Sequence, residues 1–494
     1  MHKFMILKRV SRTIIAVIIL LALATGCIQN TGDKGQIPIT TQSIEAQKIF
    51  LEGRQLFENL RIDEARELFS QALETDPDFV QAHLYRSLSS ETAMNSEQHL
   101  QKAMSLAMNA SEGEQLLVAA VMAAEHGNPS KEIELLEQLV QNYPRDVRAH
   151  YFLASTYDAQ HELDKAIAEF QKLLKIDPNY SRAYNHLGYA YRDKGDFEKA
   201  SEAFKRYVEL IPDEANPYDS MGDLYTKMGE YDKAIESYQK AIDLNPSFAF
   251  SQRNIGTNLV FLGKYDEARD AYRKALEMEP TAAGKIIDMR MIAYAYIYQS
   301  DFENAIKHFD KAFDMAIGAN IPEQQAQIYY AKCRVHLEAN RFDNAKQSLA
   351  ACSDVVAKSE LSEAAKFRYE KNILYEMARI ASKQKDFDRA TTKAAEYKVK
   401  VEEGYDPDQI KSYYALLGHI SIDKGNYAKA IEHFRQANQK NPYTLYLLGV
   451  SETEAGDASL GVELFKKVAN WNESSLDYAF VRSKAMARTV MAVN

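Results

Sequence analysis

Apolar and polar residues alternate along most of this chain with the period of an amphipathic α-helix, and the helical stretches are short and regularly interrupted. Residues 181–214 show the pattern. Tyr184 and Leu187 begin one apolar helix face, and Gly195 follows as a residue able to close a helix end. A second apolar stretch then runs to Pro212, which cannot continue a helix interior. The pattern predicts two short helices joined by a tight turn.

This two-helix pattern returns every 34 residues, four times in succession, between residues 147 and 282. Three columns of residues repeat at that period, namely Ala166, Ala200, Ala234 and Ala268; Phe170, Phe204, Tyr238 and Tyr272; and Pro178, Pro212, Pro246 and Pro280. A fixed period of this length is typical of a stacked repeat array, in which each unit buries its apolar face against its neighbours. The small residues of the first column allow the two helices of a unit to approach closely.

The repeat resembles the tetratricopeptide repeat, whose signature combines small, aromatic and proline residues at fixed places. Unit 215–248 carries eight of the constrained residues, which are Tyr218, Met221, Gly222, Tyr225, Ala234, Tyr238, Ala241 and Pro246. Looser matches extend the resemblance over nearly all of residues 46–475. It implies an all-α fold, a right-handed α-solenoid of about 11–12 helix pairs with a C-terminal capping helix.

The spacing of the repeats divides the chain into segments. We expect a signal peptide at 1–26, a polar tether at 27–45, N-terminal repeats at 46–146, four regular repeats at 147–282, longer irregular repeats at 283–410, C-terminal repeats at 411–475 and a capping helix at 476–494. In the irregular part the alanine column continues through Ala305, Ala345 and Ala390 at wider spacing.

The first 26 residues combine a basic start with an apolar run from Ile14 to Ala24 that is too short to span a membrane. The run ends in small residues at Cys27, which resembles the lipobox of bacterial lipoproteins. The resemblance implies that Cys27 becomes the lipidated first residue of the mature protein. Ala24 stands where that family prefers Leu. Ile28 is not the acidic residue associated with inner-membrane retention, so the outer membrane is favoured if the organism is Gram-negative.

The net charge is −10, and removal of the four basic residues of the leader would make it −14. This acidic and dispersed balance argues against a nucleic-acid-binding surface, which needs concentrated Lys and Arg. The sequence has no phosphate-binding loop, no metal-ligating His pattern and no nucleophile motif. We therefore expect no enzyme activity, no catalytic residue, no cofactor and no metal.

Cys333 and Cys352 occupy the eighth and twenty-seventh places of one irregular repeat. In the family these places face each other across the helix pair, so the resemblance implies a possible disulfide in an oxidising compartment. The alternative is a pair of small buried thiols that fill alanine-sized holes.

In the family, the second, fifth, ninth and twelfth places of each first helix line a concave groove that binds peptides. The resemblance places in this groove Arg148, Tyr151, Ser155, Asp158, Arg182, Asn185, Tyr189, Arg192, Asn216, Asp219, Asp223 and Arg253. The mixture of Arg, Tyr and Asn in the first two sets suits recognition of a protein partner.

These features predict a membrane-anchored scaffold that binds protein or peptide partners at a bacterial cell envelope, with the lipid as its contact with the membrane. Three alternatives stay open. The chain could bind a carbohydrate or small ligand in a region rich in Tyr294, Tyr298 and Tyr330. It could be a non-catalytic subunit of an envelope enzyme, or part of a secretion or pilus assembly complex. An enzyme without a known motif would require a cluster of perturbed carboxylates in one pocket.

Overall fold

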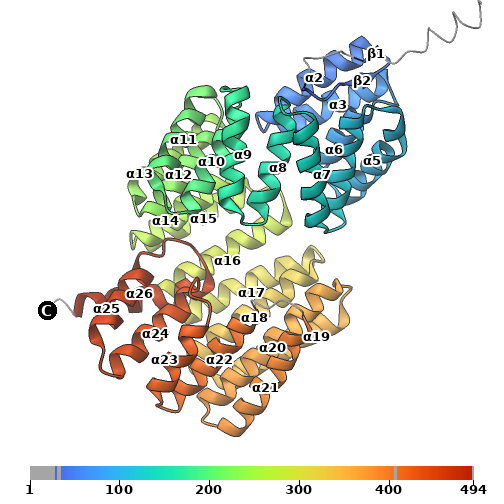
Figure 1. The fold of residues 1–494 in the computed structure, drawn as a ribbon. Helices are drawn as coiled ribbons and strands as arrows, with labels where there is room; N and C mark the ends of the chain where they lie inside the picture. Colours follow the sequence, from blue (N-terminus) through green and yellow to red (C-terminus); the bar gives the residue numbers. More distant parts are fainter. Residues whose placement is uncertain (1–27, 30–34, 405–408, 492–494) are drawn as a thin grey trace, which may run out of the picture. The chain divides into compact units, whose positions relative to one another are not determined.

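The computed structural model describes residues 28–29, 35–404 and 409–491 (Figure 1). The expected signal peptide and Cys27 lie outside these residues. The chain forms two compact units, Met1–Pro212 and Asp213–Asn494, and each is described by itself below.

The first unit contains five helix pairs preceded by a short extended segment. Its elements are β1 (Ile28–Gln29), β2 (Thr40–Thr41), α2 (Ile44–Glu58), α3 (Ile62–Thr75), α4 (Val80–Leu88), α5 (Ala93–Leu106), the 3-10 helix η1 (Ala107–Asn109), α6 (Glu112–Glu125), α7 (Pro129–Asn142), α8 (Val147–Ala159), α9 (Leu163–Ile176), α10 (Ser181–Asp193) and α11 (Phe197–Leu210). The two strands pair antiparallel, with Ile28 opposite Thr41.

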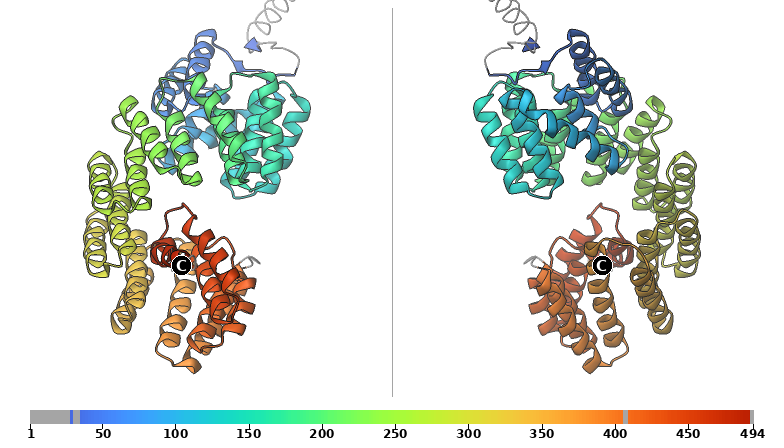
Figure 2. Two further views of the ribbon diagram at one scale, coloured as in Figure 1. Left: turned by 90° about the vertical axis from the view of Figure 1, so that its left-hand side faces the viewer. Right: turned by 90° about the vertical axis from the view of Figure 1, so that its right-hand side faces the viewer.

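The second unit continues the same architecture with seven pairs and one further helix (Figure 2). Its elements are α12 (Asn216–Met228), α13 (Tyr231–Leu244), α14 (Ala249–Phe261), α15 (Tyr265–Met278), α16 (Ala282–Tyr298), α17 (Phe302–Gly318), α18 (Pro322–Glu338), α19 (Phe342–Lys358), α20 (Glu363–Lys383), α21 (Phe387–Glu403), α22 (Ile410–Asp423), α23 (Tyr427–Gln436), α24 (Pro442–Glu454), α25 (Ala458–Ala469) and α26 (Leu476–Met491). The twelve pairs α2–α25 confirm the all-α solenoid and the expected number of repeats.

The turns between paired helices share one backbone conformation, although their sequences differ. The expected helix stop Gly195 has a φ angle of 79°, and the equivalent Gly229 of the next pair has one of 80°, both in the left-handed region that closes a helix C-terminus. Pairs without this glycine reach the same region with other residues, such as His161 at 59° and Ser300 at 60°. Repeat geometry therefore imposes this conformation even where glycine is absent, at a local cost in strain.

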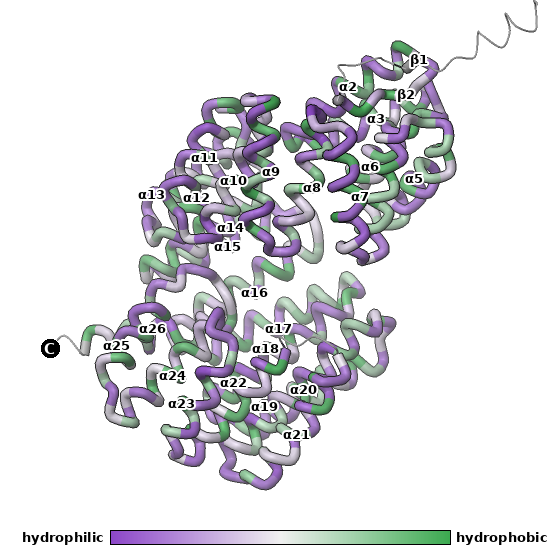
Figure 3. The backbone as a smooth tube through the Cα atoms, viewed as in Figure 1, coloured by the Kyte–Doolittle hydropathy of each residue, from purple (hydrophilic) through white to green (hydrophobic). Residues whose placement is uncertain are grey.

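Hydrophobic and hydrophilic residues alternate along the helices (Figure 3). Buried side chains of the two helices of a pair pack together, as Phe50 of α2 and Phe69 of α3 do. The glycine at the eighth place of a repeat lies under the aromatic ring at the twenty-fourth place. A Cβ atom on Gly188 would lie 2.4 Å from the ring of Phe204, and one on Gly418 would lie 2.5 Å from the ring of Phe434. Close approach of the paired helices thus depends on these glycines.

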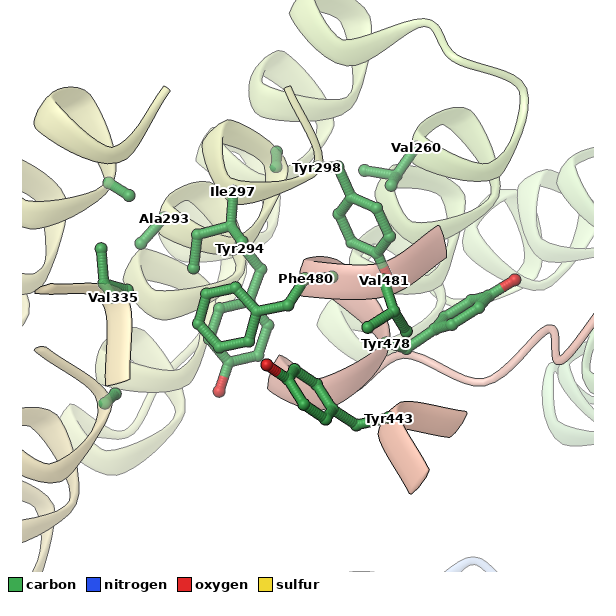
Figure 4. Packing of buried hydrophobic residues seen from close by; sticks show 14 of the residues in the cluster. Val260, Ala293, Tyr294, Ile297, Tyr298, Val335, Tyr443, Tyr478, Phe480 and Val481 are labelled. Atoms are coloured by element: carbon green, nitrogen blue, oxygen red, sulfur yellow. The ribbon is translucent and has the colours of Figure 1, made fainter. Parts of the chain in front are cut away.

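Helix α26 does more than close the last repeat. It contacts α25 and α24 but also α16, far back along the array. Tyr478, Phe480 and Val481 pack toward Tyr298 and Tyr443 (Figure 4). The expected C-terminal capping helix is therefore present, but it lies across first helices of the unit instead of covering only its end. Among the described residues, no helix is both long enough and apolar enough to cross a membrane.

Cys333 and Cys352 are free and fully buried, so the structure shows the packing alternative and not the disulfide. The Cys352 thiol donates a hydrogen bond to the Ala326 carbonyl oxygen at 3.3 Å, and burial raises its pKa to about 12. Because the thiolate is the reactive form, we expect both cysteines to resist alkylation at pH 8 in the folded protein and to react rapidly in denaturant. Mass spectrometry after iodoacetamide treatment measures this, and rapid modification of the folded protein would contradict the buried placement.

Candidate binding surfaces on the inner faces

Each unit has an inner face made by the first helices of its pairs. Successive first helices contact one another. Helix α4 contacts α6, α8 contacts α10, and α20 contacts both α18 and α22. The second helices contact chiefly their own partner and the next first helix. The first helices are therefore packed more closely together than the second helices. This difference curves the array, and the first helices lie on its concave side.

In the first unit, part of this wall already binds an extended polypeptide segment, residues 35–43 of the chain itself. The backbone N–H of Ile37 donates to Asp146 Oδ2 at 2.8 Å. The carbonyl oxygen of Ile37 accepts a hydrogen bond from Arg148 Nη2 at 2.9 Å. Both main-chain groups of this residue are therefore satisfied by side chains at the start of α8.

The same arrangement continues along the segment. The backbone N–H of Thr40 donates to Glu114 Oε1 at 2.9 Å, and the backbone N–H of Gln42 donates to Asp76 Oδ2 at 2.9 Å. The hydroxyl of Thr40 donates to Glu114 Oε2 at 2.6 Å. Residues at the end of α3 and at or next to the starts of α6 and α8 thus hold one extended segment mainly through its backbone.

Two isoleucines complete this docking. Ile37 is 3% exposed and packs in a core with Val80 and Leu117, and Ile39 packs in a second core with Phe50. The polar stretch 27–45, expected to be a tether, therefore contains a segment that is buried against the first unit. Its polar composition conceals this role, because the buried polar groups are satisfied by hydrogen bonds that sequence does not reveal.

Arg148 is the centre of the docking network. Its guanidinium pairs with Asp146 at 2.5 Å and donates to Gln81 Oε1 at 2.7 Å, and the residue is only 4% exposed. Burial alone would lower the pKa of Arg148, but the Asp146 carboxylate outweighs burial and raises it. Arg148 was expected to bind a partner, and in this structure it binds the chain's own backbone.

The other predicted groove residues of the first unit lie together on α8 and α10. Tyr151 is buried and contacts His186 Nε2 through its hydroxyl at 3.0 Å, and Arg182 lies between the rings of Phe57 and Tyr151. The remaining predicted residues are half-buried and comprise Ser155, Asp158, Asn185, Tyr189 and Arg192. Arg182 is thus engaged in packing within the unit.

The predicted residues of the second unit form two charged groups on α12 and α14. Asp219 is 5% exposed and accepts a hydrogen bond from Ser251 Oγ at 2.5 Å, and Asp223 accepts one from Tyr238 Oη at 2.7 Å. Arg253 pairs with Glu279 at 3.3 Å and with Asp288. Asn216 is half-buried at the start of α12.

Asp219 makes stability depend on pH. Burial and the neighbouring Asp223 raise the pKa of Asp219 from 3.8 to about 7. The folded state therefore binds this proton more tightly than the unfolded state. The stabilisation that protonated Asp219 provides is complete below about pH 4 and is lost as the pH rises through 7. We expect Asp219→Asn to raise the melting temperature at pH 8 relative to wild type and to change it little at pH 4.5. Equal shifts at both pH values, measured by calorimetry, would contradict this.

A further hollow lies on the inner face of the second unit, in the region of irregular repeats. It is a cavity of about 230 Å³ whose lining includes Tyr330 and Arg334 of α18, Tyr375, Glu376 and Arg379 of α20, and His419 of α22. Tyr443 of α24 and Asp477 of α26 complete its charged and aromatic wall. Burial and the charge of Arg379 hold the pKa of His419 well below its usual range, so this imidazole is neutral at pH 7.

Sequence reasoning placed one lining residue, Tyr330, in a possible ligand-binding region but missed the others, because it considered groove positions only in the regular repeats. Counting back from Ala345 and Ala390 at the twentieth place puts Tyr330 and Tyr375 at the fifth place and Arg334 and Arg379 at the ninth. The signal was therefore present in the alanine column. Tyr294 and Tyr298, which we grouped with Tyr330 as a ligand-binding region, are instead buried against α26.

The cavity does not have the chemistry of an acid–base active site. The two carboxylates that line it, Glu376 and Asp477, pair with Arg379 and Arg334. Burial would raise the pKa of Asp477, but Arg334 outweighs it and lowers the pKa, so this carboxylate stays ionised. Within the described part of the chain, no group of three His, Cys, Asp or Glu residues is placed to hold a metal ion.

Comparison with protein families identifies the repeats. Models described as tetratricopeptide repeat match residues 50–93, 123–185, 159–224, 220–248, 254–281, 290–352 and 412–443. The matches include the irregular region around α16–α19. Repeats of this class form extended concave surfaces that bind other proteins.

Comparison with known proteins adds partial likenesses. No curated protein matches the chain significantly. A crystal structure of MamA is 29% identical, covering 35% of this chain and 93% of that chain, with a TM-score of 0.31. YrrB, described as a TPR protein with an unusual peptide-binding site, is 22% identical over 36% of this chain and 91% of that chain, with a TM-score of 0.28. PilF of Pseudomonas aeruginosa is 17% identical over 44% and 90%, with a TM-score of 0.32.

Proposed function

We propose that this chain, which is built of tetratricopeptide repeats, is a lipid-anchored scaffold that binds extended segments of protein partners on its inner faces at a bacterial cell envelope. The observation that carries the proposal is the docking of residues 35–43 on the first unit. This segment is held through backbone groups by Asp146, Arg148 and Glu114. Because every polypeptide has these groups, the same kind of wall can bind segments of other proteins.

The inner face of the second unit carries two hollows. The hollow of about 230 Å³ adjoins another of about 600 Å³ on the same face, and both are lined by Tyr330 and Asn372. Their walls combine tyrosine, arginine and amide side chains, which supply rigid contact area and directed hydrogen bonds. A partner segment lying along α18 and α20 would use both hollows.

The membrane part of the proposal rests on Cys27 and the leader before it. Because Cys27 immediately precedes β1, a lipid on this residue would hold the first unit close to a membrane surface. We expect Cys27→Ser to move the protein from the membrane fraction to the soluble fraction. Mass spectrometry of the N-terminal peptide would detect the lipid, and an unmodified thiol at residue 27 of the mature protein would overturn the anchor.

Cross-linking in native envelopes tests partner binding. A photoreactive amino acid is placed at Asn372 on the inner face or at the exposed Asn344 on the second helix α19, which provides a matched control. We expect partner proteins to cross-link from residue 372 and not from residue 344. Equal cross-linking from both positions, or none from residue 372, would contradict an inner-face docking site.

A further inference from the structure

The 230 Å³ cavity of the second unit has an unusual hydrogen-bond balance. It lies where α18, α20, α22 and α24 meet the start of α26. Three carboxylates lie in or beside it, on Glu338, Glu376 and Asp477. Four cations lie with them, on Arg334, Arg379, Lys411 and Lys484. The cluster therefore carries an excess of one positive charge.

The carboxylates of this cluster already have their hydrogen-bond donors. Glu376 accepts from Tyr330 Oη at 3.0 Å and from Arg379 Nη1 at 3.1 Å. Asp477 accepts from Asn441 Nδ2 at 2.7 Å and from Arg334. Glu338 pairs with Lys484 at 3.1 Å and accepts from the Tyr443 hydroxyl. Each of the three carboxylates therefore already has at least two donors within the protein.

The arginines, in contrast, keep donors to spare. Arg379 is 3% exposed, and its Nε has no hydrogen-bond partner among the described residues. The Nε of Arg334 also lacks one, although it lies 3.5 Å from Glu376 Oε1 as an ion-pair contact. A buried guanidinium N–H without an acceptor is costly, and a charged acceptor makes the strongest hydrogen bond to it. The cavity wall thus provides two buried guanidinium donors that have no hydrogen-bond partner among the described residues.

We propose that this cavity is a binding site for a carboxylate group. A planar monoanion suits two arginines that have donors to spare, and an excess of one positive charge matches a monoanion better than a dianion such as phosphate. Tyr375 and the neutral His419 provide flat, weakly polar walls for the carbon atoms next to the carboxylate. The volume is below the usual 300–1,000 Å³ range of drug-sized ligand sites, so it suits a small group.

The carboxylate could belong to a free small acid or to an acidic side chain of a bound protein segment. The adjoining 600 Å³ hollow, which shares Tyr330 and Asn372, leaves room for the rest of a larger ligand. The site itself does not depend on the proposed scaffold role, because purified protein can be tested without any partner.

Calorimetric titration of the full chain tests whether the carboxylate belongs to a free small acid. The titrants are succinate and its uncharged analogue succinamide. We expect succinate to bind and succinamide to bind at least tenfold more weakly. Asn438→Asp adds a negative charge at an exposed residue of the cavity rim and should weaken succinate binding about fivefold. Asn344→Asp makes the same change on the exposed face of α19 and should leave binding unchanged.

A second titration uses the blocked peptide Gly-Gly-Glu-Gly-Gly and its Gln counterpart. Binding of the Glu peptide alone, weakened by Asn438→Asp, would assign the carboxylate to a protein segment. Binding of succinate alone would assign it to a small acid. The proposal is overturned if neither probe binds, or if Asn438→Asp and Asn344→Asp behave alike. Failure of the cross-linking experiment would leave these titrations unaffected, so the two ideas fail separately.

Discussion

Arg148→Ala is expected to lower the free energy of unfolding of the first unit by about 3–5 kcal/mol and to release residues 35–43 from its surface. The substitution removes a fully buried guanidinium and leaves the Asp146 carboxylate buried without its partner. It also removes the donor to the Ile37 carbonyl oxygen. Arg148→Lys should be nearly as damaging, because an ammonium group cannot make the forked contacts with Asp146, Gln81 and Ile37 at once.

Hydrogen exchange followed by mass spectrometry checks both effects in the full chain. Backbone amides of residues 37–42 should lose protection in Arg148→Ala before the helices of the unit do. Lys175→Ala, at an exposed position of α9, is the control and should leave exchange unchanged. Retained protection of residues 37–42 in Arg148→Ala would show that the two isoleucines suffice for docking.

Gly418→Ala is expected to destabilise the second unit by about 1–3 kcal/mol, although glycine to alanine in a helix ordinarily stabilises by about 0.5–1 kcal/mol. The added methyl group would lie 2.5 Å from the ring of Phe434, inside normal contact distance. Either the ring or the helix pair α22–α23 must move to accommodate it. The sign of the change is therefore the informative result.

Urea denaturation of Gly418→Ala, Gly318→Ala, Phe434→Leu and a double variant measures this effect. Gly318→Ala is the control, because a Cβ atom there meets nothing within 4 Å, and it should be neutral or slightly stabilising. In the double variant Gly418→Ala with Phe434→Leu, the two losses should not add, because the smaller side chain relieves the overlap. Equal behaviour of Gly418→Ala and Gly318→Ala would contradict the close approach of the paired helices.

The sequence by itself determined the repeat fold. The alanine, aromatic and proline columns depend only on contacts within a pair and with the next pair, and such local contacts recur whenever the spacing recurs. For that reason Gly195 was recognised as a helix stop and is found in the left-handed conformation. The same arithmetic was not carried into the longer repeats, and in the regular repeats it did not reveal that Arg148 contacts the chain's own backbone.

Only the tertiary structure decided what occupies the inner faces. Residues 35–43 and α26 bind helices far away in the chain, as the contacts of Ile37 with Arg148 and of Arg482 with the Phe261 carbonyl oxygen show. The repeat period of the sequence does not predict such contacts, because each occurs once and joins segments of unrelated sequence. Whether Arg148 or Arg379 has donors to spare depends likewise on which acceptors the fold places beside it, and that is a property of the assembled wall.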